Sequence, residues 1–228
     1  MTTPPDGRLP PLTDGRVRSF KVRQGKLSAL TLERLSRLWP ERDLPPGPVD
    51  PQAVFGRDAP LVVEVGCGHG AAAIEYASTH PEHDVIAIDM HLPGLARMLA
   101  AADAAGVANL RVSRGDAVEL LADRLEPGRL AAVHLFFPDP WPKSKHVKRR
   151  FVTAQTLDLI ASRLAPGGHL LVATDQPAYA EHVVGRARRR GGLEVAVVGR
   201  PPWRPLDGFE VKGLHAGRQI IDLRLTRG

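Results

Sequence analysis

Residues 61–70 read LVVEVGCGHG, an apolar run that leads directly into glycines at positions 66, 68 and 70. The run LVVEV predicts a buried strand, and the helical pattern AAAIEYAS follows the glycines. Glycine lets a backbone approach a ligand closely. In a doubly wound sheet, the loop after the first strand lies where ligands bind. The stretch therefore predicts the first strand, loop and helix of an α/β sheet with a ligand site.

The rest of the chain repeats this alternation. Apolar runs at residues 84–89, 109–113, 131–137 and 168–175 are each followed by a helical pattern. This β/α repetition predicts a parallel sheet covered by helices on both faces. The last two runs, 193–199 and 218–226, have no long helix between them. They predict an antiparallel pair at the edge of the sheet.

The N-terminal part has a different composition. Residues 1–15 are rich in Pro, Gly and Asp, which predicts a flexible tail. Residues 16–55 combine a basic arm, a leucine-rich helix that Pro40 should end, and a Pro-rich connector. We assign residues 56–228 to one catalytic domain, because a chain of this length builds one good core.

Composition excludes several classes of protein. No apolar run approaches the roughly 20 residues of a membrane span, and the start lacks a secretory signal, so we expect a cytoplasmic protein. Cys67 is the single cysteine and cannot form an internal disulfide. His80 and His83 give the best paired ligand spacing, which is too little for a metal site. We therefore expect no metal and no membrane.

Positive charge is concentrated along the chain. The formal net charge is +6, and residues 16–37, 143–150 and 186–190 hold 16 of the 31 Lys and Arg residues with one acid, Glu33. Such segregation predicts a basic face for a polyphosphate, as in nucleic-acid binding. The alternative is that each cluster is only a solvated face.

The glycine loop has acidic neighbours that define its ligand. Glu64 precedes it, and Asp89 stands at the end of the second predicted strand, suitably placed for ribose hydroxyls. The spacing G-x-G-x-G favours a methyl donor over NAD, although both remain open. Asp116 ends the third strand, where it could approach an adenine or cap the next helix together with Glu119.

The fourth strand ends in LFFPDPWPKSKHVKRRF, residues 135–151. Prolines at 138, 140 and 142 stiffen a loop that presents Asp139 and Trp141 at the carboxyl edge of the sheet. The five cations that follow could hold the phosphates beside a base: they are Lys143, Lys145, Lys148, Arg149 and Arg150. A hydrophobic plug at Trp141 and a solvated helix start are the alternatives.

Together these segments resemble the bacterial tRNA (guanine-N7-)-methyltransferase family, from Arg16 to Leu225. The arm RVRSFKVRQGKL, the loop EVGCGHG, the signature FFPDPWPKSKHVKRRF, the ATD of residues 173–175 and the late FE-x-x-G segment carry the resemblance. It implies an S-adenosylmethionine-dependent enzyme that methylates N7 of a guanine in the tRNA variable loop. The implied fold is a doubly wound, Rossmann-like sheet of seven strands with a reversed last strand.

The resemblance also implies site residues. The donor site would comprise Glu64, Gly66, Gly68, Gly70, Asp89, Asp116 and Asp139, and Asp139 would also be catalytic. Guanosine would be held by Lys143, Asp175, Asp207, Phe209 and Glu210. RNA would contact Lys145, His146, Lys148, Arg149 and Arg150.

Two positions depart from the family pattern. Asp89 stands where the family usually has Glu, and Asp207 stands where it usually has Thr. Asp175 and Glu210 could alternatively be loop caps. Two other functions remain open, a methyltransferase acting on an exocyclic or side-chain amine and a non-catalytic RNA-binding protein. The oligomeric state, monomer or homodimer, also remains open.

Overall fold

The computed structural model describes residues 26–206 and 208–228, with the side chain of Ser144 excepted. The predicted tail, most of the basic arm and Asp207 therefore lie outside the described residues. The strands are β1 (Leu61–Val65), β2 (Asp84–Asp89), β3 (Leu110–Arg114), β4 (Leu130–Phe136), β5 (Leu164–Thr174), β6 (Leu193–Val198) and β7 (Ile221–Arg227).

The helices lie mostly between these strands. They are α1 (Ala29–Arg42), α2 (Pro51–Phe55), α3 (Ala71–Thr79), α4 (Leu92–Ala104), α5 (Ala117–Glu119), α6 (Ala154–Arg163), α7 (Pro177–Arg190) and α8 (Gly208–His215). A π-helical turn, η1 (Leu120–Arg124), continues α5, and a 3-10 segment, η2 (Ser144–Arg149), follows β4.

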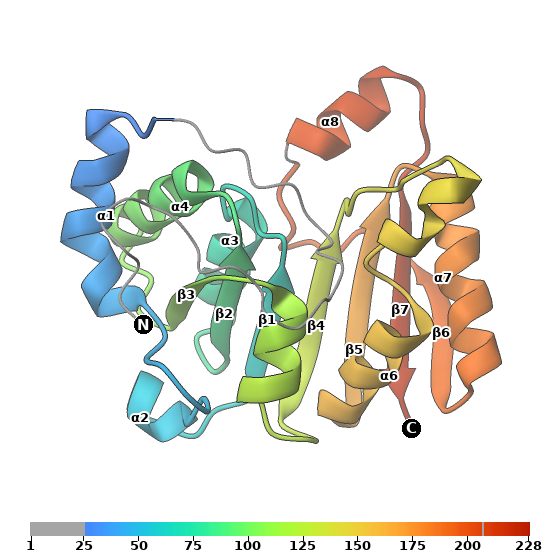
Figure 1. The fold of residues 1–228 in the computed structure, drawn as a ribbon, viewed down its shortest axis with the longest axis horizontal. Helices are drawn as coiled ribbons and strands as arrows, with labels where there is room; N and C mark the ends of the chain where they lie inside the picture. Colours follow the sequence, from blue (N-terminus) through green and yellow to red (C-terminus); the bar gives the residue numbers. More distant parts are fainter. Residues whose placement is uncertain (1–25, 207) are drawn as a thin grey trace.

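One sheet joins all seven strands in the order β3-β2-β1-β4-β5-β7-β6 (Figure 1). β1 pairs in parallel with both β2 and β4, whereas β7 is antiparallel to β5 and to β6. The predicted doubly wound sheet with an antiparallel last strand is confirmed. Because β1 pairs with β4 on one side and β2 on the other, the chain reverses its winding direction between β1 and β4.

Helices cover both faces of the sheet. Alternate residues of β1 point to opposite faces: Val62 packs with α1, α3 and α4, whereas Val63 packs with η1, α6 and α7. Both side chains are fully buried. This burial on both faces explains why the strand reads as a continuous apolar run.

The end of α1 differs from the prediction. Pro40 lies inside the helix, which continues to Arg42. A proline removes only its own N–H, and the N–H of Asp43 still donates to the carbonyl oxygen of Trp39 at 2.8 Å. The prediction that Pro40 ends the helix was therefore wrong by two residues.

Two further differences concern segments near α6 and the connector. Residues 151–153 precede α6 instead of belonging to it, because Thr153 caps that helix in a capping box with Thr156. The connector contains the short helix α2, which Asp50 caps through the N–H of Gln52. Among the helices of the described residues, none is long and apolar enough to cross a membrane.

Candidate active site

A cavity of about 620 Å³ opens at the carboxyl ends of β1, β2 and β4. It lies at the position where the winding of the sheet reverses, which is the usual ligand site of such sheets. Its walls come from the loop after β1, the ends of β2, β3 and β4, and the start of α8. A volume of this size is in the range of small-molecule sites, about 300–1,000 Å³.

The glycine loop, residues 66–70, forms one wall. Gly66, Gly68 and Gly70 have φ angles of 70°, 58° and 75°, in the left-handed region that other residues rarely adopt. At Gly70 a Cβ atom would also lie 2.0 Å from Cγ of Met98. Gly66 and Gly68 therefore line the cavity with backbone alone, whereas Gly70 is buried against α4 and is not part of the cavity wall.

Asp89 fastens this loop. One carboxylate oxygen accepts a hydrogen bond from the N–H of Gly68 at 2.8 Å, and the other accepts from the N–H of His91 at 2.8 Å. Asp89 and the buried Glu64 both line the cavity. The two predicted donor-site acids thus lie in one wall.

The free thiol in this wall is unreactive. Cys67 is buried, and burial first, then the charges of Asp89 and Glu64, raises the pKa of its thiol. The raised pKa favours the thiol over the thiolate at neutral pH, so Cys67 is a poor nucleophile.

Asp116 caps the helix that follows β3. Its carboxylate accepts from the N–H of Val118 at 2.8 Å. The neighbouring residues Gly115 and Ala117 line the cavity. The capping role predicted from the sequence is confirmed.

The proline loop, residues 137–142, forms the opposite wall. Phe137 and Trp141 have φ angles of 49° and 39°, which is strained for aromatic residues. The N–H of Phe137 donates to the carbonyl oxygen of Ala173 at 2.8 Å, which ties the loop to β5. Asp139 is exposed and lines the cavity, so this loop carries the predicted catalytic carboxylate to the same cavity as the glycine loop.

The basic segment, residues 143–150, divides into exposed and buried cations. Lys143, Lys145 and Lys148 are exposed and lie outside the cavity wall. Arg149 is exposed, lines the cavity and places its guanidinium 5.0 Å from the centre of the Trp141 ring. His146 meets the same ring edge-on at 5.5 Å.

Arg150 is buried instead. Its Nε donates to the carbonyl oxygen of Pro140 at 2.9 Å, and a second nitrogen lies 3.4 Å from the carbonyl oxygen of Trp141. The sequence pattern predicts a phosphate contact for Arg150, but in the structure its side chain points into the protein interior. A contact to RNA requires exposure, and burial cannot be read from a run of basic residues.

The start of α8 closes the third side. Phe209, with 65% of its surface exposed, and Lys212 line the cavity. Glu210 points away and is buried, with one oxygen 3.4 Å from Arg204 and 3.6 Å from Arg200. Of the two predicted residues in this segment that the structure describes, Phe209 reaches the cavity wall and Glu210 does not, while Asp207 lies outside the described residues.

Asp175 is likewise outside the wall. Its carboxylate accepts from Nε of Arg218 at 2.7 Å, and its Cβ packs against Gly213 of α8. Arg204, which no sequence motif singled out, binds both oxygens of Asp222 and lies 5.1 Å from the Phe136 ring. Arg204 therefore joins α8 and β7 through ion pairs and contacts β4 through the Phe136 ring.

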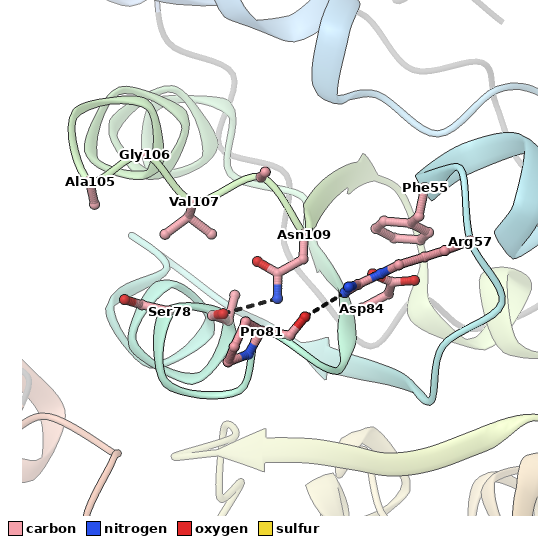
Figure 2. A pocket seen from close by; sticks show the side chains of 11 residues that line it. Phe55, Arg57, Ser78, Pro81, Asp84, Ala105, Gly106, Val107 and Asn109 are labelled. Atoms are coloured by element: carbon pink, nitrogen blue, oxygen red, sulfur yellow. Dashed lines mark hydrogen bonds and ion pairs between the residues drawn. The ribbon is translucent and has the colours of Figure 1, made fainter.

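A second cavity, of about 450 Å³, lies at the amino ends of β2 and β3 (Figure 2). Arg57 there donates to Asp84 at 2.7 Å, and Asn109 donates to the carbonyl oxygens of Ala77 and His83. Because these groups bind the protein itself, they do not converge on a ligand. Over residues 26–206 and 208–228, no group of three or more His, Cys, Asp or Glu side chains could hold a metal ion.

Comparison with solved structures supports the fold. A 16S rRNA methyltransferase, KamB, superposes with a TM-score of 0.60 at 19% identity over 82% of this chain and 99% of that one. The 16S rRNA (adenine(1408)-N(1))-methyltransferase of Catenulisporales acidiphilia gives a TM-score of 0.51 at 21% identity, covering 78% and 92%. At these identities the likeness concerns the fold alone.

Sequence comparison is more specific. A family model described as "Putative methyltransferase" matches residues 58–223. The tRNA (guanine-N(7)-)-methyltransferase of Chromohalobacter salexigens is 42% identical over 92% of this chain and 89% of its own length. That of Aeromonas hydrophila is 43% identical over 93% and 92%. The chain therefore belongs to the S-adenosylmethionine-dependent tRNA (guanine-N(7)-)-methyltransferase family.

Proposed function

We propose that this chain methylates N7 of a guanine in the variable loop of tRNA, in the cavity between the glycine loop and the proline loop. One observation carries the proposal. The proline loop brings Asp139, and the basic segment brings Arg149, to the same cavity that Gly66, Gly68 and Asp89 line. A carboxylate and a cation for the acceptor thus face the predicted donor site.

The residues present fit S-adenosylmethionine. The left-handed glycines leave backbone exposed to the cavity, and Asp89 and Glu64 supply carboxylates for its polar groups. Gly115 and Ala117 offer a small-residue wall, with Asp116 beside them. When bound, this cofactor supplies a methyl group on a positively charged sulfur.

Guanine N7 has an in-plane lone pair and no proton, so its methylation needs no strong general base. Alignment of two reactants can contribute roughly 7–11 kcal/mol, whereas general base catalysis contributes about 10²–10⁴-fold. Positive charge develops on the purine as the methyl group transfers. The fixed carboxylate of Asp139 favours that charge, and it can accept hydrogen bonds from N1–H and the exocyclic amine of guanine.

The remaining predicted residues fall into three groups. Phe209 and Arg149 line the cavity, which supports direct contact with the acceptor nucleoside. Glu210 and Asp175 are ion-paired, so we propose that they orient α8. Lys143 and Asp207 remain candidates for substrate binding from the resemblance.

Three side chains of the basic segment would bind tRNA phosphates: the exposed Lys145 and Lys148, and the half-buried His146. We further propose that the enzyme works in the cytoplasm, where tRNA is processed, as a monomer or homodimer.

Nucleoside analysis tests the function. Purified protein is incubated with methyl-labelled S-adenosylmethionine and tRNA that lacks modifications, and the tRNA is digested to nucleosides. Label in 7-methylguanosine from the variable loop is the expected result. Label on an exocyclic amine would favour the amine methyltransferase, and tRNA binding without labelled product would favour a non-catalytic RNA-binding protein.

A further inference from the structure

Three side chains on the α4 side of the cavity form a group that the proposed function does not use. We call His69, His91 and Arg97 the α4 rim. His69 and His91 line the cavity, and their ring centres are 6.4 Å apart. Arg97 lies one and a half turns into α4, just outside the cavity wall, and all three are exposed. None of them carries a role implied by the family resemblance.

Arg97 is an uncompensated cation. Its guanidinium lies 3.2 Å from Nε2 of His69, and among the described residues no carboxylate pairs with it. Other exposed arginines do have such partners: Arg37 binds Asp103 at 3.0 Å, and Arg190 binds Asp158 at 2.8 Å. The charge of Arg97 is thus available to a ligand.

Hydrogen bonding fixes which ring nitrogens carry protons. Arginine can only donate, so Nε2 of His69 accepts and the proton of the neutral ring lies on Nδ1. Nδ1 of His91 accepts from the N–H of Gly94 at 3.2 Å, which leaves the proton on Nε2. Within the described part of the chain, neither of these N–H groups has a protein acceptor. The rim therefore combines two N–H donors with one positive charge, which suits an anion.

The rim faces a second set of cations across the cavity. β1 lies between β2 and β4 in the sheet. His91 follows β2 and Arg149 follows β4, so the two residues lie on opposite sides of the cavity. Lys212 of α8 lines the cavity on the side of Arg149. In the described residues no carboxylate forms an ion pair with Arg149 or Lys212 either. A ligand with several anionic groups would meet positive charge on both sides of the mouth.

We propose that the α4 rim binds a backbone phosphate of the RNA, so that the RNA strand spans the cavity mouth from Arg97 to the basic segment. Phosphate is favoured over the carboxylate of the methyl donor because Arg97 lies outside the cavity wall. Two-sided anchoring would hold the strand on either side of the guanine that enters the cavity. This inference rests on the proposed function, since it assumes that tRNA is the substrate.

Salt-dependent binding tests the proposal. Each phosphate contact contributes roughly 0.7–0.9 to the slope of log affinity against log salt concentration. We expect Arg97→Ala to lower that slope by about this amount and to weaken tRNA binding roughly tenfold at low salt, as for the loss of a hydrogen-bonded charge. Arg97→Lys should keep most of the slope, because it keeps the charge. Donor affinity, measured by calorimetry without RNA, should stay unchanged.

Arg129→Ala is the matched control. Arg129 is an exposed arginine that directly precedes β4, at the end of the strands opposite the cavity and outside the three basic clusters, and its loss changes net charge equally. The proposal is wrong if Arg97→Ala leaves the slope unchanged, if it weakens donor binding instead, or if Arg129→Ala lowers the slope equally. A wild-type protein that fails to bind tRNA would count against the proposed function itself.

Discussion

Nε of Arg150 donates a hydrogen bond to the carbonyl oxygen of Pro140 at 2.9 Å, from inside the protein. The guanidinium also lies 5.8 Å from the centre of the Tyr179 ring, on α7. One buried cation thus connects the proline loop to the helix behind it. Because Asp139 immediately precedes Pro140, this bond anchors the backbone that carries the predicted catalytic carboxylate.

Arg150→Met should therefore separate loop support from RNA binding. Loss of hydrogen bonds from a charged group costs about 3 kcal/mol of stability here, measurable by urea unfolding. Turnover should fall by about 10²-fold, because a misplacement near 1 Å can cost that much. The slope of log tRNA affinity against log salt concentration should change by less than the roughly 0.7–0.9 that one phosphate contact contributes. A full unit of lost slope would instead make Arg150 a phosphate ligand.

Asp139→Asn should reduce turnover by about 10²-fold or more and leave donor affinity nearly unchanged. The amide keeps the size and hydrogen-bonding capacity of the side chain but removes the charge that favours the cationic purine. Single-turnover assays with saturating donor and tRNA measure the chemical step. Near-normal turnover would reject the charge-stabilising role and direct attention to other carboxylates.

Lys145→Ala combined with Lys148→Ala should lower the salt slope of tRNA binding by about 1.4–1.8, twice the contribution of a single phosphate contact. Both side chains are exposed and outside the cavity, so donor binding should not change. The control is Arg129→Ala with Arg224→Ala, which removes two exposed charges outside the three basic clusters. If the salt slope of tRNA binding is equal in the two double variants, the basic segment is only a solvated surface.

Gly94→Ala should weaken donor binding although Gly94 does not line the cavity. A Cβ atom there would lie 2.4 Å from the carbonyl oxygen of Gly68, so the glycine loop must shift. We expect at least a tenfold rise in donor Kd by calorimetry. Gly185→Ala in α7 is the control, because its Cβ would meet only the flexible end of Arg189 at 3.5 Å. That helical substitution should stabilise the fold by about 0.5–1 kcal/mol.

His134 should make the fold sensitive to acid. It is buried in β4, and burial first, then the neighbouring charges of His169, His80, His83 and Arg204, lowers its pKa from 6.5 to about 3. Below pH 6.5 the unfolded chain binds a proton that the folded chain does not, so stability falls as pH falls. The loss amounts to about 2 kcal/mol at pH 5.

His134→Leu tests this dependence, because leucine is of similar size and does not titrate. The free energy of unfolding is measured in urea at pH 5 and at pH 8. The difference between the two values should be about 2 kcal/mol smaller in the variant than in the wild type. If the variant and the wild type lose equal stability on acidification, His134 is not the responsible group.

The strands and the placement of the glycine and proline loops after β1 and β4 could be predicted because their signals are local. Apolar runs of about five residues, glycines after β1 and prolines after β4 depend on neighbours in sequence. The two loops reach the same cavity because β1 and β4 are adjacent at the point where the winding reverses. The sheet topology thus places the two loops, which are distant in sequence, in one site.

The orientation of individual charges could not be predicted, because it depends on partners distant in sequence. Glu210 is buried because Arg204 is held by Asp222, and Asp175 is turned toward Arg218. Arg150 and Arg149 are neighbours in a basic run, yet one supports the loop and the other lines the cavity. Residue type alone does not distinguish such cases.

The two hydrogen bonds of Asp89 bear on the speed of the catalytic cycle. Its carboxylate joins the N–H groups of Gly68 and His91, so the donor wall is assembled before any ligand arrives. A wall that is already ordered loses little entropy when a ligand binds. Exchange of spent for fresh donor then requires no refolding of the loop, which spares the catalytic cycle that step.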